Sequence, residues 1–460
     1  MTSPYEAVPA LMSAGQRQLW LAHQLAADST ALNVVLAVRV RGELAPDPLA
    51  RALTSVVARH ELLRSRFVTG ADGLPVAELR PAHELVPDER QAGGAADEPP
   101  DGVDDRLFAL AHRVGQEPLD PAHEVFRLVV LRQGDQDSVL VVVAHHLVSD
   151  ATSQVLVLRD LLDGHAAEHT GQPAPARPRP IPWDAYVRAE RDRADSSRGR
   201  LAREHWRRIG AGVPAAGLPT ARCGAARDAA AGATLRLLLP PDTAARVRTV
   251  SAAAQVTPFA WLLAAFQAAL YRSGGAAQAL IGVPATTRWA PGTREAVGYF
   301  VDTFPVVARF DAATTFRSAA LAAQRGLAEG MRHLGCPVEL PDAARLFRTI
   351  VTLIRADRLP VPGLVDGETE YAGLRLTLLD VPQQEGQADL AVEIVQSDRG
   401  FAVMLRYDTA LFDPATMERF GGVLLRLVGV SLDAPDTRIT RAPLATPEDL
   451  AFLLSLGAGS

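Results

Sequence analysis

Apolar residues recur along this chain at two spacings, and segments with the two spacings alternate. Steps of three and four residues predict helices, and short runs rich in β-branched residues predict strands. Leu49, Leu53, Val56 and Val57 lie on one face of a helix that Asp47-Pro48 opens. In the first half we expect strands at 63–68, 126–132 and 138–144. In the second half we expect helices at 242–254, 259–270 and 414–427, and strands at 279–284, 304–310, 390–396 and 401–407.

Three segments interrupt this pattern with small, polar, glycine or proline residues. Residues 89–104 predict an exposed insertion, and residues 210–233 are rich in alanine and glycine. Residues 171–182 hold five prolines, which predicts a stiff connector. Two mixed α/β halves joined by this connector would leave a cleft between them, and such clefts are common binding sites.

The strand predicted at 138–144 leads directly into two adjacent histidines. Its continuous apolar run predicts a buried strand, His145 and His146 follow, and Asp150 comes four residues after His146. Residues 153–164 then show helical spacing, and Asp150 or the serine before it can cap that helix. The pattern holds an imidazole at the rigid end of a buried element. Imidazole is the side chain that exchanges a proton near neutral pH.

A histidine pair alone is weak evidence for catalysis. With 11 histidines in 460 residues, roughly one chain in four of this composition would hold such a pair by chance. Neighbours on a strand also point to opposite faces, so one of the two rings can simply be a core histidine. Position alone leaves both interpretations open.

Composition narrows the classes of protein. A net charge of −6 argues against a generic nucleic-acid binder, and 48% hydrophobic residues are enough for large cores. Two cysteines, Cys223 and Cys336, form neither a disulfide framework nor a zinc pattern, which fits a reducing compartment. The chain has no lysine, so a P-loop lysine and a Schiff-base lysine are excluded within it.

Neither a secretion signal nor a membrane span is predicted. Residues 1–18 lack a basic region followed by an apolar stretch. The most apolar segment, 259–270, is only about twelve residues long, which is too short to cross a bilayer. It predicts a buried helix that Thr257 caps. We therefore expect a cytoplasmic protein that binds neither membrane nor nucleic acid.

Several short segments, in order along the chain, resemble the motifs of one family. The central one is His145-His146-Leu-Val-Ser-Asp150, which matches the HHxxxDG motif up to its last position. The others are Ser13–Trp20, Arg59–Phe67, Pro284–Arg288, Val297–Thr303 and Tyr407–Asp413. The chain resembles a condensation domain of nonribosomal peptide synthetases, within the chloramphenicol acetyltransferase-like superfamily. The resemblance covers nearly the whole chain.

The resemblance implies an α/β fold of two chloramphenicol acetyltransferase-like lobes in a V-shaped pseudo-dimer, with an active-site tunnel between them. We expect residues 1–176 to form the N-terminal lobe with the HHxxxD motif. Residues 177–460 would form the C-terminal lobe, with crossing elements near 285–300 and 355–390. Phosphopantetheine arms of a donor and an acceptor peptidyl carrier protein would enter from opposite sides. The domain itself would bind no cofactor, and we expect a monomer.

The resemblance also assigns roles to residues. His146 would be catalytic, because a neutral imidazole can accept the amine proton and hold the tetrahedral intermediate. His145 would be structural, with its ring bonded to the backbone. Asp150 would be architectural, because a buried carboxylate needs a partner. Arg288 is the expected partner and Arg64 the reserve, although a solvated surface arginine is the commoner case for either.

The resemblance places four more residues on the channel and no metal in it. The channel-lining residues would be Ser149, Ala151, Asp302 and Thr303. No metal-ligand cluster stands out in the sequence. Cys336 near His333 suggests a Cys-His nucleophile, but this segment aligns with an ordinary loop of the family.

The chain departs from the family pattern at several positions. Ala151 stands where the family has glycine, and Asp302 stands where it has asparagine. The Arg-Asp-x-Ser-Arg-Asn-Pro-Leu segment of the family is absent in recognisable form, and only Arg345-Leu-Phe347 remains of it. These changes predict an atypical donor, acceptor or subtype, or weak or lost activity. The intact HHxxxD core favours an active enzyme.

We therefore expect an acyltransferase that forms an amide between two carrier-bound substrates. Ester formation and transfer from coenzyme A are the alternative reactions. The alternative without catalysis is a domain that recruits a carrier protein or a tailoring enzyme. Ala151 and Asp302 favour this last class, and the HHxxxD core opposes it. Residues 442–450 resemble the linker into an adenylation domain, so we expect such a domain downstream in the parent chain.

Overall fold

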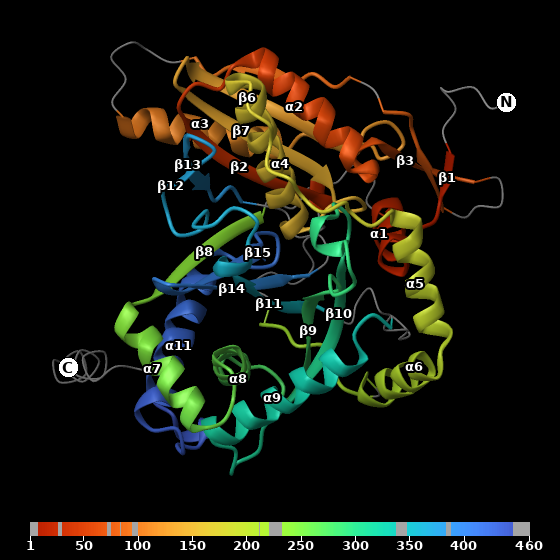
Figure 1. Ribbon diagram of the computed structural model, residues 1–460. Helices are drawn as coiled ribbons and strands as arrows, with labels where there is room; N and C mark the ends of the chain where they lie inside the picture. The colour runs from red at the N-terminus through yellow and green to blue at the C-terminus, as the bar shows by residue number, and fades with distance from the viewer. Residues whose placement is uncertain are drawn as a thin grey trace.

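Two six-stranded sheets dominate the computed structural model, one built mainly from each half of the chain (Figure 1). The structure describes residues 8–25, 30–70, 75–82, 84–93, 100–210, 212–219, 232–336, 347–382 and 388–444. Some segments discussed above fall outside these ranges, namely Cys223, Arg345 and residues 94–99, 220–231 and 445–460.

The N-terminal sheet explains the continuous apolar run before the two histidines. β7 (Asp137–His145) lies inside this sheet, antiparallel to β2 and β6. Leu140 and Val142 pack with α2 and α4 on one face, whereas Val139 and Val141 pack with α3 on the other. Because both faces are covered, both are apolar. The strand order is β12 (Thr369–Tyr371), β13 (Leu374–Leu379), β2 (Asn33–Arg41), β7, β6 (Phe126–Gly134) and β5 (Asp88–Gln91), and the helices are α2 (Pro46–Arg59), α3 (Pro100–Gly115) and α4 (Ala151–Thr170).

The C-terminal sheet packs against four helices around one core. Its strand pairs are antiparallel except those of β11, which runs parallel to β9 and β14. The strand order is β10 (Val301–Arg309), β9 (Gln278–Thr286), β11 (Thr349–Arg355), β14 (Leu390–Ser397), β15 (Gly400–Asp408) and β8 (Gly232–Leu239). The helices are α7 (Pro241–Ala253), α8 (Pro258–Arg272), α9 (Phe316–His333) and α11 (Pro414–Asp433).

The helix predicted at 259–270 is α8, and it lies inside the C-terminal core. Its residues from Ala260 to Leu270 are buried, and the Thr257 hydroxyl caps it by accepting the Ala260 N–H at 3.1 Å. Within the described ranges, no helix taken singly has the length and apolarity to cross a bilayer. The α7–α8 pair, bent by 102°, reaches that threshold by length and composition alone.

Two segments of the C-terminal half cross into the N-terminal half. β13 pairs antiparallel with β2, so a strand from beyond residue 370 extends the N-terminal sheet. Val297 and Phe300 also lie in the N-terminal core. Between the halves, α5 (Trp183–Asp195) packs Trp183 on the N-terminal core, and α6 (Ser197–Gly210) packs Trp206 on the C-terminal core. The halves therefore share core side chains, and the lobe boundary at residue 176 stays a prediction.

The prediction of an exposed insertion at 89–104 is wrong for both ends of this segment. Residues 88–91 form β5, which pairs in parallel with β6, and α3 begins at Pro100. β5 is polar because it is an edge strand whose side chains alternate between half-buried and exposed. The predicted strand at 63–68 begins later, because a 3₁₀ turn occupies Glu61–Arg64. That strand is β3 (Ser65–Thr69), which forms a three-stranded sheet with β4 (Pro75–Leu79) and β1 (Val8–Ala10). Elements without a sequence prediction include α1 (Ala14–Leu25), β1 and β4.

We predict that Gly330→Ala destabilises the fold. Gly330 of α9 lies against Phe304 of β10, and a Cβ at this position would overlap the buried Phe304 ring. Overpacking of this kind costs about 1–3 kcal/mol. The control is Gly429→Ala in α11, where a Cβ meets no atom within 4 Å. This change should be neutral or stabilise by about 0.5–1 kcal/mol. Urea unfolding measures both, and equal midpoints for the two variants would contradict the prediction.

Candidate functional site

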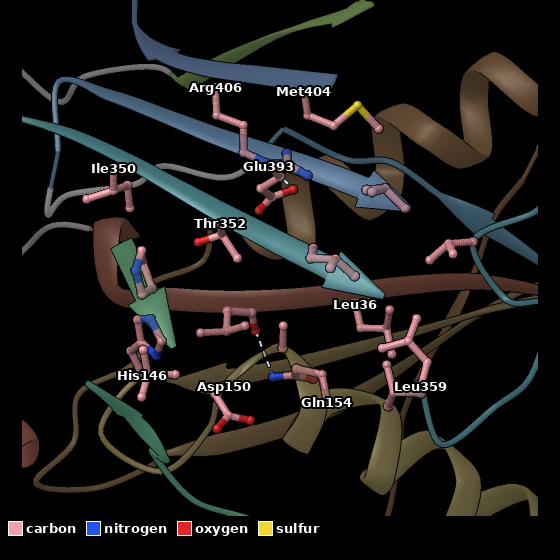
Figure 2. A pocket seen from close by; sticks show the side chains of 18 of the residues that line it. Leu36, His146, Asp150, Gln154, Ile350, Thr352, Leu359, Glu393, Met404 and Arg406 are labelled. Carbon is pink, nitrogen blue, oxygen red and sulfur yellow. Dashed lines mark hydrogen bonds and ion pairs between the residues drawn. The ribbon is translucent and has the colours of Figure 1, made fainter. Parts of the chain in front are cut away.

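A cavity of about 1530 Å³ lies between the two sheets. β2 and the first turn of α4 form its N-terminal wall, and β11, β14 and β15 form its C-terminal wall (Figure 2). Much of the lining is apolar, as at Leu36, Ile350 and Met404. His146 also lines the cavity, so the second histidine of the pair faces a space that both halves of the chain enclose.

Backbone contacts fix both the position and the tautomer of His146. Its backbone N–H donates to the Leu32 carbonyl at 2.7 Å, which continues the β2–β7 pairing beyond the strand end. Its ring Nδ1 lies 2.7 Å from the Ser149 carbonyl, which can only accept, so Nδ1 carries the proton. The ring edge packs on Tyr299 with centroids 5.0 Å apart. Nε2 is thus left with its lone pair and has no hydrogen-bond partner among the described residues.

The surroundings of His146 keep its ring neutral. Burial lowers the pKa of the His146 imidazole below its ordinary value of 6.5, and the hydrogen bond to Ser149 offsets part of this shift. At neutral pH the Nε2 lone pair is therefore available. It can accept a proton or a hydrogen bond from a group inside the cavity.

His145 lies on the other side of the strand and is buried. Its Nδ1 accepts the Leu147 N–H at 3.2 Å, and its ring meets His23 edge-on with centroids 5.1 Å apart. Burial and the nearby His23 and His146 lower the pKa of His145 to about 3. The ring therefore has the backbone hydrogen bond that was expected, and its structural role stays a prediction.

Asp150 joins three parts of the chain through one buried carboxylate. Oδ1 accepts the Ser153 N–H at 2.7 Å, which caps α4. The Arg288 guanidinium donates to Oδ1 at 2.9 Å and to Oδ2 at 3.1 Å. Oδ2 also accepts the Phe300 N–H at 3.1 Å. The carboxylate therefore fastens the first turn of α4 to the segment that crosses from the C-terminal half.

Arg288 is in turn enclosed by acceptors. It donates to the Ser153 hydroxyl at 2.7 Å and to the Thr293 and Ala296 carbonyls, and it lies over the Phe300 ring at 4.2 Å. The expected Asp150–Arg288 pair is thus present. The reserve partner was wrong, because the Arg64 guanidinium donates to the Arg80 and Val57 carbonyls instead.

The family model described as the condensation domain matches residues 9–454. The chain belongs to the condensation domain family. It is 27% identical over 454 residues to a linear gramicidin synthase of Brevibacillus parabrevis, a match that covers 95% of this chain and 6% of that protein. It is 26% identical over 466 residues to phosphinothricin tripeptide synthetase PhsC of Streptomyces viridochromogenes, over 98% of this chain and 42% of that protein. The chain thus spans less than half the length of these relatives.

A solved structure has the same fold. The X-domain in its complex with OxyB, from teicoplanin biosynthesis, superposes with a TM-score of 0.80 and 21% identity, over 96% of this chain and 98% of that one. This likeness confirms the two-lobed α/β fold that the motifs implied. The resemblance to condensation domains of nonribosomal peptide synthetases is likewise confirmed.

Three of the four residues expected on the channel of this condensation domain line the cavity. These are Ala151, Asp302 and Thr303. Ser149 does not line it, because its side chain is buried at the turn between β7 and α4. It acts on the site through its backbone carbonyl, which holds the His146 ring.

Asp302 is a cavity carboxylate without a cation beside it among the described residues. Its Oδ2 accepts the Gly335 N–H at 2.8 Å. Burial, with a smaller contribution from the negative charge of Glu190, raises the pKa of Asp302 to about 7. Glu190 also lines the cavity, and burial raises its pKa too. The asparagine usual at position 302 would bring no charge here.

Sequence analysis missed a charged pair on the wall formed by β14 and β15. Glu393 and Arg406 both line the cavity, with the Arg406 Nε 3.1 Å from the Glu393 carboxylate (Figure 2). Arg406 also pairs with Asp380 at 3.1 Å. One sequence signal could have indicated this pair. Each of the two predicted strands contains a charged residue among apolar ones, and the alternation of side chains along a strand fixes the face on which that residue lies.

Sequence analysis also missed a cluster on α6 and α9, outside the cavity. His205, Glu329 and His333 offer ligand atoms within 4.8 Å of one another. The two imidazoles are stacked face to face with centroids 4.2 Å apart, and Arg332 pairs with Glu329. Arg332 already pairs with one oxygen of the Glu329 carboxylate, which weighs against this cluster as a metal site. Cys336 is buried, which raises the pKa of its thiol and opposes a nucleophilic role.

We predict that Asp150→Ala lowers the free energy of unfolding by about 3–5 kcal/mol, because it leaves the Arg288 charge buried and unpaired. Thr257→Ala is the control, since it removes a helix cap without breaking an ion pair and should cost about 1 kcal/mol. Urea denaturation measures both variants. If Asp150→Ala were as stable as the control and yet inactive, the carboxylate would have a direct chemical role.

We predict a pH-dependent effect of Asp302→Asn on stability. The folded-state pKa of about 7 lies above the ordinary 3.8, so the folded chain holds a proton that the unfolded chain releases. The stability that this proton contributes is complete below pH 3.8 and is lost as the pH rises to about 7. The unfolding free energy of the wild type minus that of Asp302→Asn should fall across this window and stay constant above it. Denaturation at several pH values measures the difference, and a rise with pH would contradict the prediction.

Proposed function

We propose that this condensation domain catalyses amide formation between an aminoacyl acceptor and an acyl or peptidyl thioester donor. The observation that carries the proposal is the Nε2 lone pair of His146. This atom belongs to a neutral ring held by the Ser149 carbonyl, and the ring faces a cavity that both sheets enclose. A proton acceptor at a fixed position inside a large enclosed space is what thioester aminolysis requires.

In the proposed reaction, the acceptor nitrogen attacks the thioester carbonyl carbon. A C–N bond forms and the C–S bond breaks. The proton that the nitrogen loses passes to His146 Nε2 and then to the departing thiolate, so His146 returns to its neutral state. While the tetrahedral intermediate exists, the protonated ring also offsets its negative charge. His146 is the catalytic residue in this scheme.

Orientation supplies much of the rate in this proposal. An amine is already a good nucleophile once it is neutral, so holding both reactants at one place contributes strongly. A volume of about 1530 Å³ accommodates two tethered substrates together. Ala151 adds a methyl group at the start of α4, where the family has glycine, and the cavity persists beside it. Substrate passage from two opposite sides belongs to this proposal.

The proposed partners are a donor and an acceptor peptidyl carrier protein. Their phosphopantetheine arms would bring both thioesters to His146, so the domain needs no resident cofactor. The relatives that the chain matches are peptide synthetases by name, which supports carrier-bound substrates. We place a monomeric domain in the cytoplasm as part of the same proposal.

A recruitment domain without catalysis is the second candidate. The superposition on the X-domain, solved in a complex with OxyB, favours it. This candidate does not require a free imidazole lone pair in a large cavity, whereas catalysis does. Ester formation would use the same site with an alcohol acceptor and would depend more strongly on His146, because an alcohol is the poorer nucleophile.

We predict that His146→Ala lowers single-turnover amide formation by about 10²–10⁴-fold, the usual contribution of a positioned base. Rapid-quench mass spectrometry with two loaded carrier proteins measures the rate, and circular dichroism checks that the fold is retained. His169→Ala, an exposed histidine near the end of α4, is the matched control and should keep wild-type turnover. Near-wild-type turnover by His146→Ala would refute the catalytic assignment. Wild-type protein that forms no amide but retains a partner enzyme would favour recruitment.

A further inference from the structure

The cavity carries more carboxylates than cations. Six acidic residues line it, against three arginines and no lysine. Part of this charge is balanced within the protein, since Asp150 pairs with Arg288, and Asp380 and Glu393 both lie on Arg406. The other two lining arginines, Arg236 and Arg399, are exposed residues of β8 and of the turn between β14 and β15.

Asp302 and Glu190 have no such partner among the residues that the structure describes. Asp302 accepts the Gly335 N–H at 2.8 Å, and Glu190 accepts the Ala14 N–H at 2.9 Å. Within the described ranges, no arginine comes within ion-pair distance of either carboxylate. The arginines that lower the pKa of Glu190 from a longer range are Arg17, Arg191 and Arg193, and none of them lines the cavity.

The groups around this pair suit a cation. Tyr186 and Tyr299 line the same cavity, and aromatic faces attract cations. The Tyr186 hydroxyl is already bonded to the Thr287 hydroxyl at 2.8 Å. Tyr299 also packs against His146, so one of these rings lies beside the proposed catalytic residue. Two buried carboxylates without a cation are expensive to keep ionised, and a cationic ligand removes that cost.

We propose that Asp302, with Glu190 beside it, binds a cationic group of the substrate, namely a side-chain ammonium or guanidinium. This inference rests on the proposed function, because it selects among substrates of the same cavity. Either the acceptor or the donor can carry the cation, and the chemistry recognised is the same. Asparagine at position 302, the usual residue of the family, retains the acceptor for the Gly335 N–H and lacks the charge. Asp302→Asn therefore tests the charge without removing that hydrogen bond.

Calorimetric titration with four stable pantetheine amides tests the proposal on the intact chain. Lysyl and norleucyl amides with a free α-amine represent the acceptor, and their Nα-acetyl derivatives represent the donor. Each pair differs in one terminal ammonium. We expect the lysyl probe of one arm to bind at least about tenfold more tightly than its norleucyl counterpart, which corresponds to about 1.4 kcal/mol. In Asp302→Asn this ratio should fall to near one. Asp105→Asn, an exposed carboxylate on α3, should leave the ratio unchanged.

The arm that shows the preference identifies which substrate carries the cation. Equal affinities in both arms, a preference that survives Asp302→Asn, or no binding of any probe would overturn the inference. Amide formation is measured separately with loaded carrier proteins. Turnover without a preference for basic substrates overturns only the inference. Tight binding of lysyl probes without any turnover overturns only the proposed function.

Discussion

One buried ion pair, between Asp150 and Arg288, sets the geometry on which the rest of the site depends. The two residues are 138 positions apart, and their charges are almost completely removed from water. Such a pair is tolerable only when additional hydrogen bonds offset the loss of hydration. Here the Ser153 and Phe300 amides donate to the carboxylate, and the two terminal nitrogens of the guanidinium donate to the Ser153 hydroxyl and two carbonyls, while its Nε has no hydrogen-bond partner in the part of the chain that the structure describes. The first turn of α4 is therefore fixed to the segment that crosses from the C-terminal half. The turn that carries His146 lies between this helix and β7, which is paired inside the N-terminal sheet.

The second constraint is that the two halves share a core. β13 extends the N-terminal sheet, and Val297 and Phe300 pack among N-terminal side chains. The two walls of the cavity are consequently parts of connected cores, even though they come from distant segments of the chain. For a reaction that depends on bringing two tethered substrates together, fixed walls contribute directly to rate. The same connection explains why the damage from a lost ion pair at residue 150 would spread to both halves.

Sequence patterns predict the elements whose signals are local. The apolar run of β7, the cap at Asp150 and the buried helix α8 all follow from patterns within about fifteen residues. The resemblance to the family also implied Arg288 as the preferred partner of Asp150. Local patterns do not indicate which distant segments of the chain come into contact. The polar residues of β5 predict a loop, because an edge strand is recognisable only beside β6, with which it pairs. The tautomer of His146 depends on its hydrogen bond to the Ser149 carbonyl, and a contact with a backbone carbonyl cannot be predicted from the type of residue.

The charges of the cavity divide into two kinds, and the division explains why two departures from the family pattern have different consequences. Asp150 and Arg288 form an ion pair with each other, so they stabilise the structure of the site and exert only a weak electrostatic field on a substrate. Ala151 alters only shape at that locked corner. Asp302 is different, because its charge has no partner among the described residues and the asparagine it replaces would leave the cavity less negative. Burial without a paired cation raises the pKa of this carboxylate, and a cationic ligand would favour its ionised form. Of the two departures, the unpaired carboxylate therefore changes the charge of the cavity, whereas the added methyl group changes only its shape.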